Sequence, residues 1–161
     1  MLELSEMVIR FVIAAGLGAF IGFERELVGK EAGIRTAMLV AGGASIFAMI
    51  GISIPYFAQV APEQLQNTLP DRVISNIVVG IGFLGAGIII KTGEHVRGLT
   101  TAAIVWFTAA IGALVGLGLL QFALAAAVIM TGTLLILRKI DLYRLIRPGY
   151  KIENEEGQSL D

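Results

Sequence analysis

Polar residues stand out in an otherwise apolar chain, and the first group of them could bind a cation. Asp71, Arg72 and Asn76 follow Pro70 at the start of an apolar run. A carboxylate together with an amide can offer oxygen ligands to Mg²⁺, so Asp71 and Asn76 are candidate metal ligands. The alternatives for Asp71 are that it complements the dipole at the amino end of a helix or pairs with Arg10.

Two further groups lie where apolar segments meet charged ones. Glu24, Arg25 and Arg35 flank a short charged stretch, and Thr100 and Thr101 begin an apolar segment. Long charged side chains at such places reach out to water and threonines cap helices, which are structural roles. The alternatives are an ion pair between Glu24 and Arg35, and an anion site at the amino ends of the helices that begin near Arg35 and Thr100.

Residues 80–87, GIGFLGAG, have the G-x-G-x-x-G spacing that cradles pyrophosphate in dinucleotide-binding enzymes. That motif requires a long following helix and an acidic residue about 20 positions on. Here the next residues are IIIKTGEHVRG, and the position about 20 on is a threonine. We therefore reject a phosphate loop and expect no cofactor, apart from the Mg²⁺ considered above. His95 is the single histidine and cysteine is absent, so no catalytic constellation can be assembled and no enzyme activity is expected.

The composition is typical of a membrane protein. Of the 161 residues, 56% are hydrophobic and only 16% are charged. A spanning helix needs ~20 mostly apolar residues. The apolar stretches predict an all-α polytopic helix bundle with five transmembrane helices, at about residues 5–23, 35–54, 72–91, 99–116 and 119–138.

Positive charge is distributed unevenly between the two sides of such a bundle. Ten of the 12 Lys and Arg residues lie on the side of loops 24–34 and 92–98 and the C-terminus. This asymmetry predicts an outside N-terminus and a cytoplasmic C-terminus. Residues 1–138 are the predicted transmembrane domain, and residues 139–161 a cytoplasmic basic juxtamembrane helix with an acidic tail. The expected partner is the lipid bilayer, and no nucleic acid is expected.

Small residues at helical spacing predict close helix packing, because lipid provides no hydrophobic driving force between helices. In the third span, Gly80 and Gly87 lie on one face and Gly82 and Gly85 on the opposite face. We therefore expect this span to be packed on two sides and to form the centre of the bundle. The expected small-residue partners in spans one and four include Gly18, Gly22, Gly112 and Gly116.

A weak internal repeat relates the first two spans to the next two. Residues 16–37 align with residues 80–102 with six identities when Arg97 is treated as an insertion. Both copies would run from outside to inside and back, so the symmetry would be a parallel repeat about the membrane normal.

Three segments, in this order, resemble the membrane domain of the MgtC/SapB family: IGFERELVGKEAGIRT, DRVISNIVVGIGFLGAG and VRGLTTAAIVW. The resemblance covers about residues 8–140 and implies a multi-pass protein of the bacterial inner (cell) membrane, linked to magnesium homeostasis. The positions carried over are Glu24, Arg25, Gly29, Gly33, Arg35, Thr36, Asp71, Arg72, Asn76, Gly80, Gly82, Gly85, Gly87, Gly98, Thr100, Thr101 and Trp106. In two respects the chain departs from many members: Ala37 replaces a histidine, and about twenty residues follow the fifth span where a folded cytoplasmic domain is common.

Two functions are open at this point. The first is regulation of another membrane complex through the grooved helices and inner loops. The second is a cation (Mg²⁺) transporter or channel subunit with Asp71, Asn76 and Glu24 as oxygen ligands. Regulation is favoured because Asp71 and Glu24 belong near opposite surfaces and nothing acidic marks the midplane. The leftover small-residue faces also predict a homo-oligomer.

Overall fold

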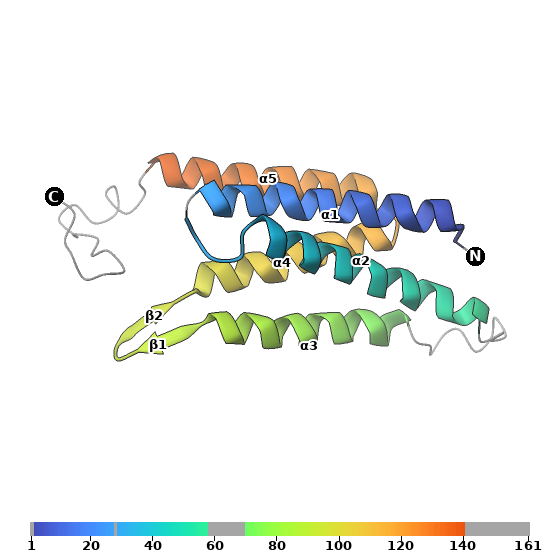
Figure 1. The fold of residues 1–161 in the computed structure, drawn as a ribbon, viewed down its shortest axis with the longest axis horizontal. Coiled ribbons are helices and arrows are strands. Elements are labelled where there is room, and N and C mark those ends of the chain that lie inside the picture. Colours follow the sequence, from blue (N-terminus) through green and yellow to red (C-terminus); the bar gives the residue numbers. More distant parts are fainter. Residues whose placement is uncertain (1, 28, 58–69, 141–161) are drawn as a thin grey trace. The chain divides into compact units, whose positions relative to one another are not determined.

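The computed structural model describes residues 2–27, 29–57 and 70–140 and is built mainly of helices (Figure 1). These are α1 (Leu4–Leu27), α2 (Ile34–Phe57), α3 (Pro70–Ile88), α4 (Leu99–Gly116) and α5 (Leu120–Ile140). Four are long and apolar enough to cross a membrane, and α3 contains a shorter apolar segment, Arg72–Ile88. The predicted all-α membrane bundle is confirmed, and each helix falls on one of the predicted spans.

The chain divides into two compact units within α5. The first is Met1–Val128 and the second Ile129–Asp161. In the second unit, α5 continues to Ile140, and the Thr133 hydroxyl donates a hydrogen bond to the Ile129 carbonyl at 2.8 Å. The acidic tail predicted after the juxtamembrane helix lies outside the described residues, and the division into residues 1–138 and 139–161 stays a prediction.

The centre of the first unit is the contact between α2 and α4. A Cβ atom added to Gly112 would lie within 3 Å of the Ala41 backbone, and one added to Gly116 within 3 Å of the Ser45 backbone. Helix α1 packs on α2 in the same way, because a Cβ at Gly18 would lie within 3 Å of the Ala37 backbone. Close backbone approach of this kind maximises van der Waals contact where lipid removes the hydrophobic drive.

The expectation that the third span forms the centre is wrong. Among the described residues of α3, Gly85 is the single buried one, whereas buried residues run along the length of α2 and α4. An apolar cavity of about 670 Å³ lies between α2 and α3; Ile77, Ile81 and Leu84 of α3 line it, and we call it the α2–α3 groove.

A β-hairpin replaces the predicted end of the third span. Helix α3 stops at Ile88 and is followed by β1 (Ile90–Thr92) and β2 (His95–Arg97), which pair antiparallel. Gly93, with φ +61°, takes the first central position of the two-residue turn, which glycine adopts without a steric penalty. Glycine at this position between runs containing isoleucine and valine is a hairpin signal that the apolar periodicity concealed.

The connections that follow α1 and α3 agree with the predicted internal repeat, in which each copy is a helical hairpin. The α1–α2 loop and the β-hairpin lie at the same end of the first unit (Figure 1), which we call the inner end because the predicted orientation places it in the cytoplasm. The aligned residues Gly29 and Gly93 have φ of +64° and +61°. The two copies differ in packing, since a Cβ at Gly18 would clash with α2 whereas one at the aligned Gly82 would meet nothing within 4 Å.

Matched substitutions on α1 test the backbone contact. Gly18→Ala is expected to lower the free energy of unfolding by about 1–3 kcal/mol, because the new methyl group forces α1 and α2 apart. Gly16→Ala, two residues away with open space at its Cβ, should leave stability unchanged or raise it by up to ~1 kcal/mol through helix propensity. Thermal unfolding in detergent measures both, and equal midpoints for the two variants would contradict the proposed contact.

Candidate functional site

Two charged residues are buried at the inner end of α1. Glu24 is 5% exposed and Arg25 is 7% exposed. The Glu24 Oε2 atom lies 3.8 Å from Arg25 Nη1, and Arg25 Nη2 donates a hydrogen bond to Thr101 Oγ1 on α4 at 3.3 Å. We call Glu24, Arg25 and Thr101 the inner polar cluster.

Helical periodicity places Arg25 in this cluster. Ala14, Gly18, Gly22 and Arg25 recur at spacings of three and four residues, and all four are buried. At Gly22 the lack of a side chain admits Gly33 of the α1–α2 connection and Ile34 of α2, since a Cβ there would lie within 3 Å of both. The guanidinium therefore continues an apolar contact face at the point where that face reaches the first turn of α4.

The inner polar cluster is not fully satisfied by the described residues. Glu24 Oε2 and Arg25 Nε are buried and have no hydrogen-bond partner among those residues. Buried charged groups are normally paired and hydrogen-bonded, and an orphan atom in such a group is costly. The cluster thus presents one acceptor and one donor to a small polar guest such as water.

Glu26, which the sequence analysis did not single out, satisfies the amino end of α2. Its Oε2 atom accepts a hydrogen bond from the Ile34 amide at 3.0 Å. A Cβ at Gly33 would lie 2.7 Å from the same oxygen, so the glycine makes room for the carboxylate. The sequence signal that could have revealed this contact is the spacing of Glu26 from Gly33, the glycine that comes just before α2. The amino end of α2 thus receives a carboxylate of the chain itself, and the anion site considered at the amino ends of α2 and α4 stays a prediction.

The other predicted residues of the inner end have different environments. Arg35 is exposed and Glu24 pairs with Arg25, so the ion pair considered between Glu24 and Arg35 is not formed. The residue before α4 is Gly98, with φ +82° and no side-chain cap. Thr100 is exposed, whereas Thr101 is buried and accepts the bond from Arg25.

The polar residues of α3 lie apart from the inner polar cluster. Arg72 and Asn76 are exposed, and Asn76 lines the α2–α3 groove with Gly80. The Asp71 side chain lies outside the described part of the chain. Within the part described, no group of three or more His, Cys, Asp or Glu side chains is placed to hold a metal ion. Asp71 and Asn76 as Mg²⁺ ligands stay a prediction.

The glycines predicted to pack helices fall into two sets. Gly18, Gly22, Gly112 and Gly116 lie against neighbouring helices or connections, and a Cβ at Gly85 would be 3.7 Å from Ala102. Three glycines of α3 have open space within 4 Å of an added Cβ: Gly80, Gly82 and Gly87. The described residues therefore leave these three positions of α3 unpacked.

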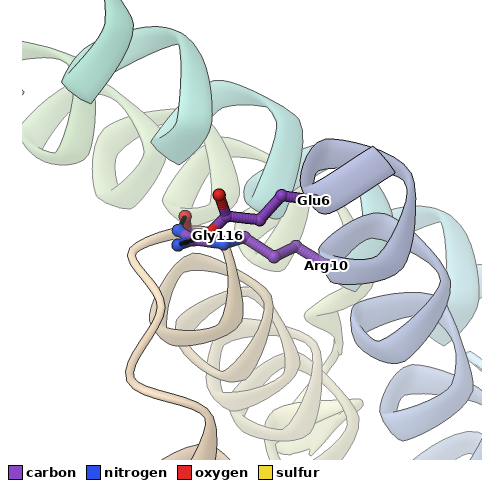
Figure 2. A network of polar contacts seen from close by, with 3 residues as sticks. All are labelled: Glu6, Arg10 and Gly116. Carbon is purple, nitrogen blue, oxygen red and sulfur yellow. Dashed lines mark hydrogen bonds and ion pairs between the residues drawn. The ribbon is translucent and has the colours of Figure 1, made fainter. Parts of the chain in front are cut away.

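Arg10 ties the beginning of α1 to the end of α4 at the opposite, outer end. Its Nη1 atom donates to the Gly116 carbonyl at 2.7 Å, and its Nη2 atom donates to Glu6 Oε1 at 2.5 Å (Figure 2). A cation at the carboxyl end of a helix satisfies free carbonyl groups and complements the helix dipole. Arg10 therefore has partners independent of Asp71, with which a pairing was considered.

Comparison with known proteins identifies the family. The protein-family model with the description "MgtC family" matches residues 11–143 of the chain. The chain belongs to the MgtC family. Together with the apolar helices, this membership makes it a membrane protein, as the three sequence segments indicated.

Bacterial relatives match the chain over most of its length. "Putative magnesium transporter YhiD" of Escherichia coli (strain K12) is 36% identical over 151 residues, which are 92% of this chain and 68% of the relative. "Protein MgtC" of Salmonella typhimurium (strain LT2) is 42% identical over 132 residues, 82% of this chain and 52% of the relative. "Protein MgtC" of Brucella abortus (strain 2308) is 44% identical over 124 residues, 77% and 48% of the two chains. The chain thus spans about half the length of these MgtC relatives. No solved structure matches it.

The buried charges of this MgtC-family chain can be tested as a pair. Arg25→Met is expected to cost about 3 kcal/mol of unfolding free energy, because it leaves the Glu24 carboxylate buried without a cation. The double variant Glu24→Gln/Arg25→Met should recover at least half of that loss. Arg35→Met, at an exposed arginine, is the control and should change stability little. Denaturant unfolding in micelles is measured for the parent, Glu24→Gln, Arg25→Met and the double variant, with Arg35→Met beside them. Additive effects of the Glu24→Gln and Arg25→Met substitutions would show that the two charges do not interact.

Proposed function

We propose that this chain is a protein of the bacterial inner membrane that acts in magnesium homeostasis by regulating another membrane complex through helix packing. Support for the magnesium link comes from the relatives, one of which carries the name "Putative magnesium transporter YhiD", and from membership in the MgtC family. The relatives compared above are bacterial proteins, and the described helices have the length and composition of membrane spans.

One observation favours regulation over conduction: the centre of the bundle is closed and the periphery of α3 is open. Gly112 and Gly116 bring α4 against the backbone of α2. In contrast, α3 borders the α2–α3 groove on one side and a second apolar cavity of about 270 Å³ beside α4 on the other. Apolar hollows next to open glycines are suited to receive a further transmembrane helix.

The polar contacts at both ends of the first unit support the same function. Arg10 fixes α1 to the end of α4, and Arg25 fixes α1 to the start of α4. These contacts join α1 to both ends of α4, which packs closely on α2, and α3 lies beside these three helices. A partner helix that inserts beside α3 would bury the Asn76 amide, whose hydrogen bond across the interface would fix its register.

A side chain that fills the α2–α3 groove should block the proposed contact with a partner helix. Gly80→Leu places a side chain where an added Cβ meets nothing within 4 Å, so the variant is expected to fold with a thermal midpoint within about 3 °C of the parent. In a strain that depends on this protein, the variant should lose growth at limiting Mg²⁺ and no longer co-purify with its membrane partner. Gly16→Leu, also open but remote from the groove, should retain both. Normal growth of the Gly80→Leu strain would contradict regulation through this groove.

A second function, a cation (Mg²⁺) transporter or channel subunit, is favoured by the orphan Glu24 Oε2 atom at the inner end. Purified protein in liposomes that carry a Mg²⁺-sensitive dye separates the two functions. Regulation predicts no flux above empty liposomes. Flux that Glu24→Gln removes, with folding retained, would establish transport instead. We also propose that the chain forms a homo-oligomer, and light scattering of the purified protein in detergent, before it is placed in liposomes, tests this.

A further inference from the structure

One face of α3 is left uncovered by the other described helices of the first unit. Helices α2 and α4 lie beside α3 (Figure 1), and Ile74, Ile77 and Ile81 line the cavities towards them. At 100° per residue, Val79 and Phe83 lie on the opposite side of the helix. These two side chains are 71% and 81% exposed, and Phe83 is the most exposed of the large hydrophobic side chains described.

The uncovered face has the spacing of a two-stranded coil. Asn76, Val79, Phe83 and Ala86 follow one another at intervals of three, four and three residues, and all four are exposed. Alternating intervals of three and four residues form a seam along which one helix stays in contact with a second helix wound around it. We call these four residues the α3 seam.

The open glycines of α3 flank this seam on both sides. Gly80 and Gly87 each follow a seam residue directly, and Gly82 directly precedes Phe83. A Cβ added to any of the three glycines would meet nothing within 4 Å. Glycines beside a seam let two helix backbones approach closely, which is what drives helix association in lipid. The positions of the three unpacked glycines therefore agree with a helix that docks along the seam.

Asn76 places an amide within this otherwise apolar seam. It comes four residues after Arg72, which is about 6 Å further into the membrane along the helix axis. An amide at such a depth is costly unless a polar group meets it. Because an amide offers both a donor and an acceptor, two asparagine side chains that face each other satisfy one another. In two-stranded coils, an asparagine in the seam fixes the register of the helices.

We propose that the α3 seam pairs with the α3 seam of a second copy of this chain, as two parallel helices around a two-fold axis along the membrane normal. Copies of one sequence insert in the same direction, so equal residues meet at equal depth. Asn76 then faces Asn76, and Phe83 faces Phe83 as an aromatic pair. This self-complementarity selects a second copy as the occupant. Arg72, one step further along the seam, reaches the outer surface, where long charged side chains turn to water.

The pairing rests on the homo-oligomer proposed above, to which it gives an interface, and does not require regulation of another complex. The two contacts share a surface, because Asn76 and Gly80 also line the α2–α3 groove. A second copy and the partner helix would therefore compete for these residues, so self-pairing should fall when the partner is bound. Gly82 does not line the groove, and a substitution there separates the two contacts.

The absence of cysteine from the chain allows single-cysteine cross-linking of the full protein. In proteoliposomes of the purified protein, Val79→Cys is expected to form a disulfide between two copies on mild oxidation, because equal seam residues face each other within reach of an S–S bond. Val78→Cys is the matched control: this neighbouring valine lines the cavity beside α4, and its variant should stay uncross-linked. Equal cross-linking of the two variants, or none at Val79→Cys, would overturn the proposal. An oligomer in light scattering without the Val79→Cys cross-link would place the interface on another face.

The strength of the pairing is measured by energy transfer between copies labelled at Glu94→Cys and diluted with lipid. Asn76→Val is expected to weaken the pairing about 3- to 30-fold, as for the loss of one hydrogen bond between membrane helices. Asn76→Gln, which keeps an amide, should lose less. Pairing of undiminished strength in Asn76→Val would refute the role of the amide.

Gly82→Leu keeps the test valid if Asn76→Val misfolds, because its new side chain enters open space. The variant should keep the thermal midpoint of the parent and its co-purification with the membrane partner, yet pair more weakly, since the leucine stands between the two backbones. Pairing as strong as that of the parent would refute the α3 seam as the interface and would leave the proposed regulatory function intact.

Discussion

The backbone-to-backbone contact between α2 and α4 is the constraint on which the rest of the structure depends. In lipid, two apolar helices gain little by leaving the acyl chains, so their association rests on the closeness of packing. Gly112 and Gly116 remove the atoms that would otherwise separate α4 from Ala41 and Ser45. With this pair fixed, α1 and α3 each contact both central helices, as a parallel repeat of two helical hairpins requires.

The burial of charge at the inner end follows from the same closeness. Because Gly18 and Gly22 draw α1 onto α2, the next residues of that face, including Arg25, are carried toward the first turn of α4. A guanidinium in that position requires a counter-charge, and Glu24 provides it from the same helix. The polar groups are thus a consequence of helix packing, and they stabilise its geometry in return.

Much of the fold could be predicted from the sequence, because span length, apolar runs and charge asymmetry are properties of single segments. The placement of the glycines could not: Gly18 and Gly82 have similar local sequences, yet a Cβ added to Gly18 would meet the backbone of α2 and one added to Gly82 would meet nothing within 4 Å. Glu26 was missed because its partner is a backbone amide, which no side-chain pattern reveals. The hairpin was missed because three-residue strands are too short to establish a period against an apolar helix.

The contact between Arg10 and Gly116 bears on how the protein enters its membrane. An arginine within a span is costly until something satisfies it, and the carbonyl that does so lies 106 residues later in the chain. The contact with Gly116 can therefore form only after α4 has been translated and inserted. Until then the guanidinium depends on Glu6 in the same helix or on water at the bilayer surface.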